Sequence, residues 1–304
     1  MSIAIEVNDL HKSYRPVRAV DGISFTVEEG EIFGMVGPNG AGKTTTIECI
    51  EGLRRPDQGT IRVVGLNPQQ DGYELRRRTG VQLQQAALPP RLKVWEGLDL
   101  FSSFYPCHVD RKILLEQLGL ADKQNTAFEK LSGGQKQRLF IALALVNDPE
   151  LVFLDELTTG LDPHARRATW DLVRGIRERG KTVFLTTHFM EEAERLCDRV
   201  AIIDHGKIVA LDTPQDLIRS LGAEQRVIFA ADGQWDDTPL RGMPGVTRVE
   251  HIGERTIIYG QGEGLVGGVV STLERMGVHF RDLRTEQPTL EDVFLALTGK
   301  EMRE

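Results

Sequence analysis

Eight consecutive residues near the start of the chain form a motif that binds phosphate. The segment from Gly37 to Thr44 reads Gly-Pro-Asn-Gly-Ala-Gly-Lys-Thr and fits the pattern G-x-x-x-x-G-K-[ST]. Glycines let successive backbone N–H groups curl around the β- and γ-phosphates of a nucleotide, and the lysine adds a positive charge across them. The threonine hydroxyl can ligate Mg²⁺. The residues expected to bind nucleotide here are Gly37, Pro38, Asn39, Gly40, Ala41, Gly42, Lys43, Thr44 and Thr45.

Two adjacent carboxylates follow an apolar segment later in the chain. Leu151-Val-Phe-Leu precedes Asp155 and Glu156. Alone, this pattern more often marks a solvated strand end. Its place after a phosphate loop favours chemistry, because the carboxyl ends of parallel strands face the ligand crevice. We expect Asp155 to hold the shell of Mg²⁺ and Glu156 to polarise a water for in-line attack on a γ-phosphate.

A third segment supplies a second anion site. Leu131-Ser-Gly-Gly-Gln135 precedes a helical pattern over residues 136–147. Ser132 is a good N-cap, and the glycines leave helical N–H donors uncovered. The segment could be a plain cap in a loop. In a chain that also has a phosphate loop, however, a complete site can be built by pairing two copies head to tail, the loop of one against the serine-capped helix of the other.

The elements that position these residues alternate between strands and helices. Strand-like apolar segments occupy residues 31–36, 151–154 and 181–187, and the chain up to residue 7 also reads as a strand. The first of these runs into the phosphate loop, and residues 44–50 are helical. Residues 201–211 read as a hairpin with its turn at residues 204–206. This alternation predicts an α/β domain with a mostly parallel sheet.

The composition bounds the function. The chain has 304 residues, 40% of them hydrophobic, which is enough to bury a core and excludes a disordered chain. Its formal net charge of −8 is of the wrong sign for binding nucleic-acid phosphates. Cys49, Cys107 and Cys197 form no pair of the zinc or disulfide type. The apolar stretches fall short of the ~20 residues that cross a bilayer.

With these motifs the sequence resembles the ATP-binding subunits of ABC transporters, over about residues 4–220. The phosphate loop, the signature at residues 131–135 and the acidic strand at residues 151–156 stand in the order that the family has. Residues 158–163 resemble the family's D-loop, and His188 its switch histidine. Gln84 matches the Q-loop glutamine, for which Gln82 and Gln85 are alternatives. Tyr14 matches the aromatic residue that stacks on adenine.

The resemblance implies a fold and a reaction. The fold is an α/β P-loop ABC ATPase core, with a mixed RecA-like sheet and a helical signature subdomain at about residues 85–148. ATP and Mg²⁺ are the implied cofactors, and the metal ligands are Thr44, Gln84 and Asp155. Two chains would enclose two ATP, most simply as a homodimer. Ser132 and Gly134 would contact the γ-phosphate held by the other protomer, and Gly133, Gln135 and Asp162 are further residues expected to bind nucleotide.

The resemblance also assigns catalytic roles. Glu156 would be the general base, His188 would steady the γ-phosphate and the attacking water, and Gln84 would report the nucleotide state to a partner. One departure is Leu157, which stands where the family usually has proline. Losing that ring frees a backbone N–H and loosens φ but removes no catalytic group.

An apolar and aromatic stretch lies inside the expected helical subdomain. Two interpretations stay open for it: the subdomain's own core, or a groove that receives a helix of a membrane subunit. The residues concerned are Trp95, Leu98, Leu100, Phe101, Phe104 and Tyr105. The basic run at residues 76–78 reads as a solvated patch, with anionic lipid as the alternative contact.

After residue 220 the pattern changes to a small α+β domain, at residues 221–304. Strand patterns at residues 226–230, 246–251, 256–259 and 279–283 surround a helical pattern at 265–276. Thr289-Leu-Glu-Asp292 fits a capping box for a last helix that ends at Leu297, with Gly299 beyond it. This ending resembles that of daunorubicin-resistance-type ATPases, which serve separate membrane subunits that export drugs, lipids or polysaccharides. A regulatory or dimer-stabilising role for this domain is a hypothesis.

We therefore expect an ATP-hydrolysing dimer that powers a separate integral membrane permease. The dimer would be a peripheral subunit at the cytoplasmic face of the cell membrane. The alternative is an ABC-type ATPase that acts on nucleic acid or ribosomes. That class predicts a second nucleotide domain, long helical arms, zinc cysteines or a basic surface, and the sequence has none of these. No nucleic-acid partner is expected. The sequence of this chain does not identify the transported substrate or the permease.

Overall fold

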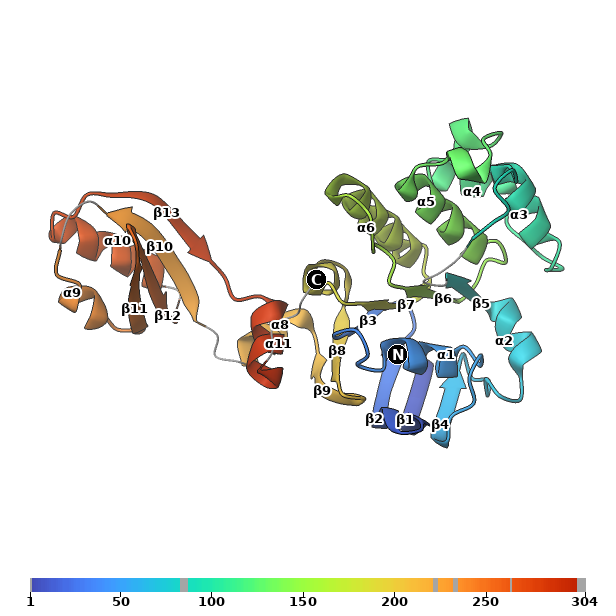
Figure 1. The fold of residues 1–304 in the computed structure, drawn as a ribbon, viewed down its shortest axis with the longest axis horizontal. Coiled ribbons are helices and arrows are strands. Elements are labelled where there is room, and N and C mark those ends of the chain that lie inside the picture. The colour runs from blue at the N-terminus through green and yellow to red at the C-terminus, as the bar shows by residue number, and fades with distance from the viewer. Residues whose placement is uncertain (1, 83–86, 221–223, 232–234, 263, 300–304) are drawn as a thin grey trace. The chain divides into compact units, whose positions relative to one another are not determined.

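A computed structural model describes residues 2–82, 87–220, 224–231, 235–262 and 264–299 (Figure 1). Contacts divide the chain into two compact units, one that ends at Pro214 and one that begins at Gln215. The sequence patterns had placed this boundary after residue 220. None of the helices in the described ranges is long and apolar enough to cross a membrane.

The first unit contains an antiparallel sheet of three strands in the order β2-β1-β4. These strands are β1 (Ile3–Tyr14), β2 (Val17–Glu28) and β4 (Gln58–Val63). Buried and exposed positions alternate along β2, as in a sheet with one face on the core. β1 continues beyond the expected end at residue 7, because register shifts carry its pairing with β2 past the polar residues Asn8 and Asp9.

A second sheet of six strands carries the chemistry. Its order is β5-β6-β7-β3-β8-β9, and its strands are parallel except for β9, which pairs antiparallel with β8. The strands are β5 (Thr79–Gln82), β6 (Leu151–Asp155), β7 (Thr182–Thr187), β3 (Ile32–Val36), β8 (Arg199–Asp204) and β9 (Lys207–Asp212). Every residue of β3, β6 and β7 is buried, as expected for apolar strands covered on both faces.

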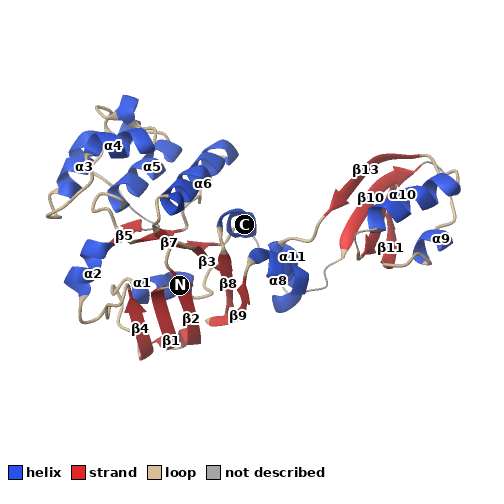
Figure 2. Cartoon of the chain, turned by 180° about the vertical axis from the view of Figure 1, so that it is seen from behind, coloured by secondary structure: helices blue, strands red, loops and turns tan. Residues whose placement is uncertain are grey.

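Seven α-helices and two 3₁₀ turns of this unit lie around the sheets in the described residues (Figure 2). They are α1 (Lys43–Ile50), α2 (Gly72–Arg78), α3 (Val94–Ser102), α4 (Arg111–Gln117), η1 (Ala121–Lys123), η2 (Phe128–Lys130), α5 (Gly133–Ala144), α6 (Pro163–Glu178) and α7 (Met190–Leu196). Helix α3 contacts both α4 and α5, so these three form a helical group within the range expected for the signature subdomain.

Two helix starts follow directly from their capping residues. Ser132 accepts from the Gln135 N–H at 3.3 Å and caps α5. Asp162 caps α6 by accepting from the N–H groups of His164 and Ala165 at 3.0 and 2.9 Å, and Pro163 stands at the first helical position. The expected hairpin is also present, with its turn at His205 and Gly206, both at positive φ.

The second unit is an α+β domain, as the sequence pattern predicted. Its strands pair antiparallel in the order β11-β12-β10-β13, and the chain order strand-helix-strand-strand-helix-strand is the split βαβ arrangement. The elements from the boundary onward are α8 (Pro214–Ser220), β10 (Gln225–Ala231), α9 (Thr238–Arg241), β11 (Val246–Ile252), β12 (Arg255–Gly260), α10 (Leu265–Arg275), β13 (Phe280–Glu286) and α11 (Leu290–Thr298).

One face of this smaller sheet forms a core with α9 and α10. The core residues are Val227, Phe229, Leu240, Val249, Ile258, Leu265, Val269 and Leu273. The last helix begins at the predicted capping box, where Thr289 and Asp292 each accept from the other's backbone N–H. It ends at Gly299, which has a φ of 68°.

Candidate active site

The phosphate loop connects β3 to α1. Some of its glycines are required because a side chain would clash with neighbouring backbone, and some because the backbone has a positive φ. A Cβ on Gly37 would lie 2.1 Å from the carbonyl oxygen of Ile203, and one on Gly42 would lie 2.3 Å from that of Ala19. Gly40 and Gly42 have φ values of 82° and 110°, which L side chains rarely adopt. The loop therefore keeps its backbone uncovered directly before the N-terminus of α1, which is a site for anions.

Lys43 is the first residue of α1, and its side chain reaches back to the start of the loop. Its side chain is 3% exposed, and Nζ donates to the carbonyl oxygens of Gly37 at 2.7 Å and Pro38 at 3.1 Å. Nζ is also 3.9 Å from Oε1 of Glu156. Burial lowers the pKa of the Lys43 ammonium, while the charges of Glu156 and Asp155 oppose that shift. A buried cation is thus held where the loop and the acidic strand meet.

The two predicted carboxylates stand at the end of β6. Asp155 is buried, and it accepts a hydrogen bond from the hydroxyl of Thr186 on β7. Burial raises the pKa of the Asp155 carboxyl, and the Thr186 hydrogen bond opposes the rise. Glu156 has a φ of 48°, and its side chain is 6% exposed. Leu157, in the position where proline is usual, buries its side chain.

His188 completes the group. Its Nδ1 lies 3.6 Å from Oε1 of Glu156, and its side chain is 15% exposed. This nitrogen is buried and has no hydrogen-bond partner. The imidazole packs against the ring of Phe189, with centroids 4.1 Å apart. The structure therefore brings Lys43, Glu156 and His188, which come from three segments of the chain, to one point.

The residues present fit Mg²⁺ that arrives with a nucleotide. No group of three histidines, cysteines or acids in the described part of the chain could hold a metal alone. Mg²⁺ commonly needs only one or two protein ligands beside substrate phosphates, and carboxylate and hydroxyl oxygens suit it. Asp155 at the end of β6 and Thr44 in the first turn of α1 offer these donors. The third predicted ligand, Gln84, lies outside the described residues, as does its alternative Gln85.

The remaining predicted binding residues lie elsewhere in the first unit. Tyr14 ends β1 and is 38% exposed, with the charged ends of Lys12 and Arg54 at 5.7 and 5.3 Å from its ring centroid. The start of α5 lies against the α6 side of the fold, since a Cβ on Gly134 would be 3.1 Å from Cβ of Ala165. Ser132 and Asp162 are both exposed there.

One residue of the site was missed by sequence reasoning. Thr186 contacts both carboxylate residues, yet the sequence marks it only as part of the pair before His188. The available signal was its position at the end of an apolar strand, like that of Asp155. Parallel pairing then sets Asp155 directly opposite Thr186.

The chain is similar to known proteins over most of its length. Residues 20–159 match the family model for ABC transporters. The chain is 42% identical to the Nod factor export ATP-binding protein I of Rhizobium etli, with 98% of this chain and 94% of that protein covered. It is also 42% identical to the protein of that name from Paraburkholderia xenovorans, with 99% of both covered.

Solved structures are similar over the larger part of the chain. An ATP-binding subunit of an ABC transporter is 30% identical with a TM-score of 0.65, covering 72% of this chain and 93% of that one. A dimeric ATP-binding cassette in a post-hydrolysis state, bound to ADP and Pi, is 27% identical with a TM-score of 0.62, covering 69% and 98%. The chain thus belongs to the ABC transporter family, as an ATP-binding subunit that hydrolyses ATP.

Proposed function

We propose that this chain is the ATP-hydrolysing motor of an exporter and acts on a separate membrane-spanning permease. The catalytic part of the proposal is supported by the positions of Lys43 and His188, which lie 3.9 and 3.6 Å from Oε1 of Glu156. This oxygen lies beside a loop in which positions 37 and 42 have no room for a side chain. A cation, a carboxylate and an imidazole at the mouth of a phosphate loop are the groups that γ-phosphoryl hydrolysis needs.

Each group has a distinct task in the proposed reaction. The Glu156 carboxylate accepts a proton from the water that attacks the γ-phosphorus in line, while the bond to the ADP oxygen breaks. His188, next to that carboxylate, orients the water and the γ-phosphate. Lys43 and the loop N–H groups neutralise phosphate charge. Asp155 and Thr44 would hold Mg²⁺ that is bound with the nucleotide, and the ion would supply further neutralisation of phosphate charge.

A second copy of the chain completes each site in this proposal. Ser132, Gly133 and Asp162 are exposed, and Gly134 and Gln135 are partly exposed, so the capped start of α5 is accessible to a nucleotide held by a partner. The dimeric state of the 27% identical cassette bound to ADP and Pi supports this arrangement. Glu156→Gln should therefore bind ATP and accumulate as an ATP-bound dimer in gel filtration. A variant that stays monomeric with ATP bound would contradict it.

The stretch at residues 95–105 divides between the two interpretations that its sequence allowed. Leu98 is fully buried and belongs to the core, whereas Leu100 and Phe104 are 47% and 68% exposed. We propose that the exposed pair receives an apolar helix of the permease. This contact would hold the subunit at the cytoplasmic face of the membrane.

Export is supported by the relatives, whose name is Nod factor export ATP-binding protein I. The proposed substrates are drugs, lipids or polysaccharides, the classes exported by the systems that the C-terminal segment resembles. The alternative of a nucleic-acid partner is disfavoured by the net charge of −8.

Two experiments test the proposal. Lys43→Ala should weaken ATP binding by about 10- to 100-fold, since a charge-assisted contact to phosphate is lost. Unchanged affinity would contradict the loop assignment.

Tagged protein captured from native membranes in mild detergent should retain a multi-span membrane protein in equal amount. Leu100→Ser with Phe104→Ser should release it, whereas Ile113→Ser, at an α4 position 47% exposed, should not. Capture of ribosomal proteins or DNA instead would contradict the exporter assignment.

A further inference from the structure

A single hydroxyl group, that of Thr186, contacts both acidic residues of the site: the carboxylate of Asp155 and the backbone N–H of Glu156. Thr186 lies near the end of β7 and is fully buried. The parallel register of β6 and β7 sets Asp155 directly opposite it. Its position is therefore fixed by the backbone pairing of two buried strands rather than by a mobile loop.

The hydrogen bonds of Thr186 have a fixed direction. The N–H of Glu156 donates to Oγ1 of Thr186 at 3.2 Å and to the carbonyl oxygen of Thr186 at 3.1 Å. A hydroxyl has one hydrogen, and an N–H cannot accept it. The hydrogen of Thr186 is thus directed to its other neighbour, Oδ1 of Asp155. The result is a one-way chain from the Glu156 N–H through Thr186 to the Asp155 carboxylate.

We propose that Thr186 is a positioning residue, which sets Asp155 for Mg²⁺ and supports the backbone of Glu156. The hydroxyl donates to Oδ1 of Asp155 and so fixes the rotation of the carboxylate that would hold Mg²⁺. The same oxygen holds the N–H of Glu156, a residue whose φ of 48° needs support from its surroundings. This inference rests on the proposed ATPase site, to which it adds a residue and a task.

The two other threonines on β7 have different partners, so the role belongs to the position of Thr186. Oγ1 of Thr187 accepts from the N–H of Phe189 at 3.0 Å, which is a local turn contact. Oγ1 of Thr182, at the opposite end of the strand, accepts from the N–H of Gly30 at 3.0 Å. Thr182 is buried like Thr186, so Thr182→Val provides a matched control that removes a buried hydroxyl away from the acids.

The test uses Mn²⁺ as the metal probe and does not depend on turnover. Mn²⁺ is titrated by electron paramagnetic resonance into the full-length chain with ATP, in the Glu156→Gln background so that ATP persists. Thr186→Val should raise the half-saturating Mn²⁺ concentration by about tenfold or more, the usual effect of losing a group that orients a metal ligand. Thr186→Ser keeps the hydroxyl and should stay within about threefold, as should Thr182→Val.

Steady-state hydrolysis provides the second measurement, with Glu156 intact. Thr186→Val should lower kcat by about tenfold or more while KM for ATP at saturating Mg²⁺ changes little, and Thr186→Ser should restore kcat. Equal Mn²⁺ affinity in Thr186→Val and Thr182→Val would overturn the inference. So would an equal loss in Thr186→Ser and Thr186→Val, a comparison that holds even if the valine variant folds poorly. Failure of the parent chain to bind Mn²⁺ with ATP would instead sink the proposed ATPase site.

Discussion

The two units of this chain use polar residues in opposite ways. In the first, the strands that carry the site are buried along their whole length, and polar side chains gather where β6 and β7 end. In the second, the sheet face opposite α9 and α10 carries charged residues along its strands, and they pair with one another. There the Arg248 guanidinium lies 4.0 Å from the Tyr259 ring centroid, and the Tyr259 hydroxyl donates to Glu250 at 2.9 Å. Polar side chains gathered at the ends of buried strands indicate chemistry, whereas ion pairs along an exposed sheet face indicate stability.

The largest effect is expected at Glu156, in the first unit. Glu156→Gln should lower ATP turnover by about 10²- to 10⁴-fold with ATP binding retained, because the amide cannot accept the proton of the attacking water. Asp237→Asn in the second unit should leave turnover unchanged. Phosphate release and equilibrium ATP binding measure both. Undiminished turnover in Glu156→Gln would remove it as the base.

A second effect of several kcal/mol is expected at a buried acid of the first unit. Glu51 is 7% exposed, and its Oε2 has no hydrogen-bond partner. Burial raises the pKa of its carboxyl to about 8. The Glu51 carboxyl therefore keeps its proton in the folded chain at pH values where the unfolded chain has lost it, above about pH 4.3. The contribution of Glu51 to the free energy of unfolding thus falls as the pH rises from about 4.3 to 8.

Glu51→Gln should remove that dependence and stabilise the chain by about 2–4 kcal/mol at pH 9, with little change at pH 4. Urea unfolding at both pH values measures it. Glu74→Gln, at an exposed residue of the same unit that pairs with Arg77, is the control. A variant no more stable than its parent at pH 9 would show that Glu51 finds a partner or solvent.

How much of this could be predicted from the sequence depends on how local each pattern is. The phosphate loop, the Ser132 and Thr289 caps and the hairpin at His205 are short segments whose residues specify their own geometry. The contact of Thr186 with Asp155 joins residues 31 positions apart and depends on which strands become neighbours. Apolar runs predict that strands exist but not their order, so this part of the site could not be read.

The same limit applies to β1. Its first residues are mostly apolar, as in a strand that packs on a core, but the polar residues Asn8 and Asp9 conceal its continuation to Tyr14. Bulges absorb the irregular pattern, and they depend on pairing with β2, which the local sequence does not reveal. In the second unit the strands were predicted because short segments that carry apolar residues lie between turns. Their order β11-β12-β10-β13 was not predicted.

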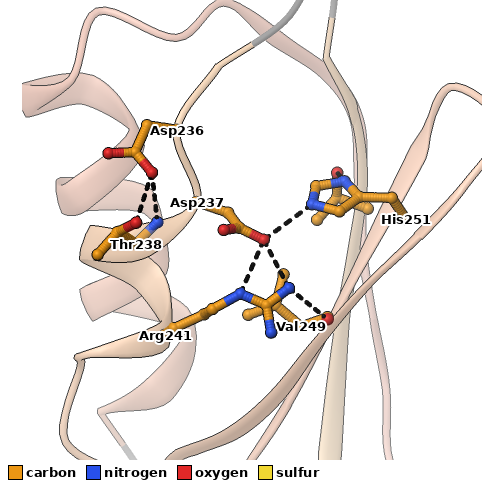
Figure 3. Close-up of polar contacts among 7 residues, drawn as sticks. Asp236, Asp237, Thr238, Arg241, Val249 and His251 are labelled. Carbon is orange, nitrogen blue, oxygen red and sulfur yellow. Dashed lines mark hydrogen bonds and ion pairs between the residues drawn. The ribbon is translucent and has the colours of Figure 1, made fainter.

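A smaller effect is expected at the paired acid of the second unit, shown in Figure 3. Oδ2 of Asp237 accepts from Arg241 at 3.0 and 2.8 Å and lies 3.0 Å from Nε2 of His251. Arg241 first, and then His251, hold the pKa of the Asp237 carboxyl below its usual value. A lowered pKa in the folded state gives stability that is present above pH ~3.9 and is lost as the pH falls through the folded value.

Asp237→Asn should therefore destabilise the second unit by about 1–2 kcal/mol at pH 7, and by less at pH 3. Amide hydrogen exchange in β11 and β12 measures it, because His251 and its other partner Thr256 belong to these strands. Asp236→Asn is the control, since Asp236 contacts the neighbouring Thr238 rather than β11. A loss that does not diminish with falling pH would assign the effect to packing instead of charge.

The smallest change in stability is expected for a glycine-to-alanine substitution in the second unit, and the same substitution in the phosphate loop provides the contrast. A Cβ on Gly37 would lie 2.1 Å from a backbone oxygen, whereas one on Gly267 in α10 would meet nothing within 4 Å. Gly267→Ala should stabilise the second unit by about 0.5–1 kcal/mol, because alanine loses less backbone entropy in a helix. Hydrogen exchange in α10 should slow while turnover stays constant. Gly37→Ala should instead abolish ATP binding. If this variant bound ATP normally, the loop would have room to move away from the Ile203 carbonyl oxygen, and Gly37 would not be required by space.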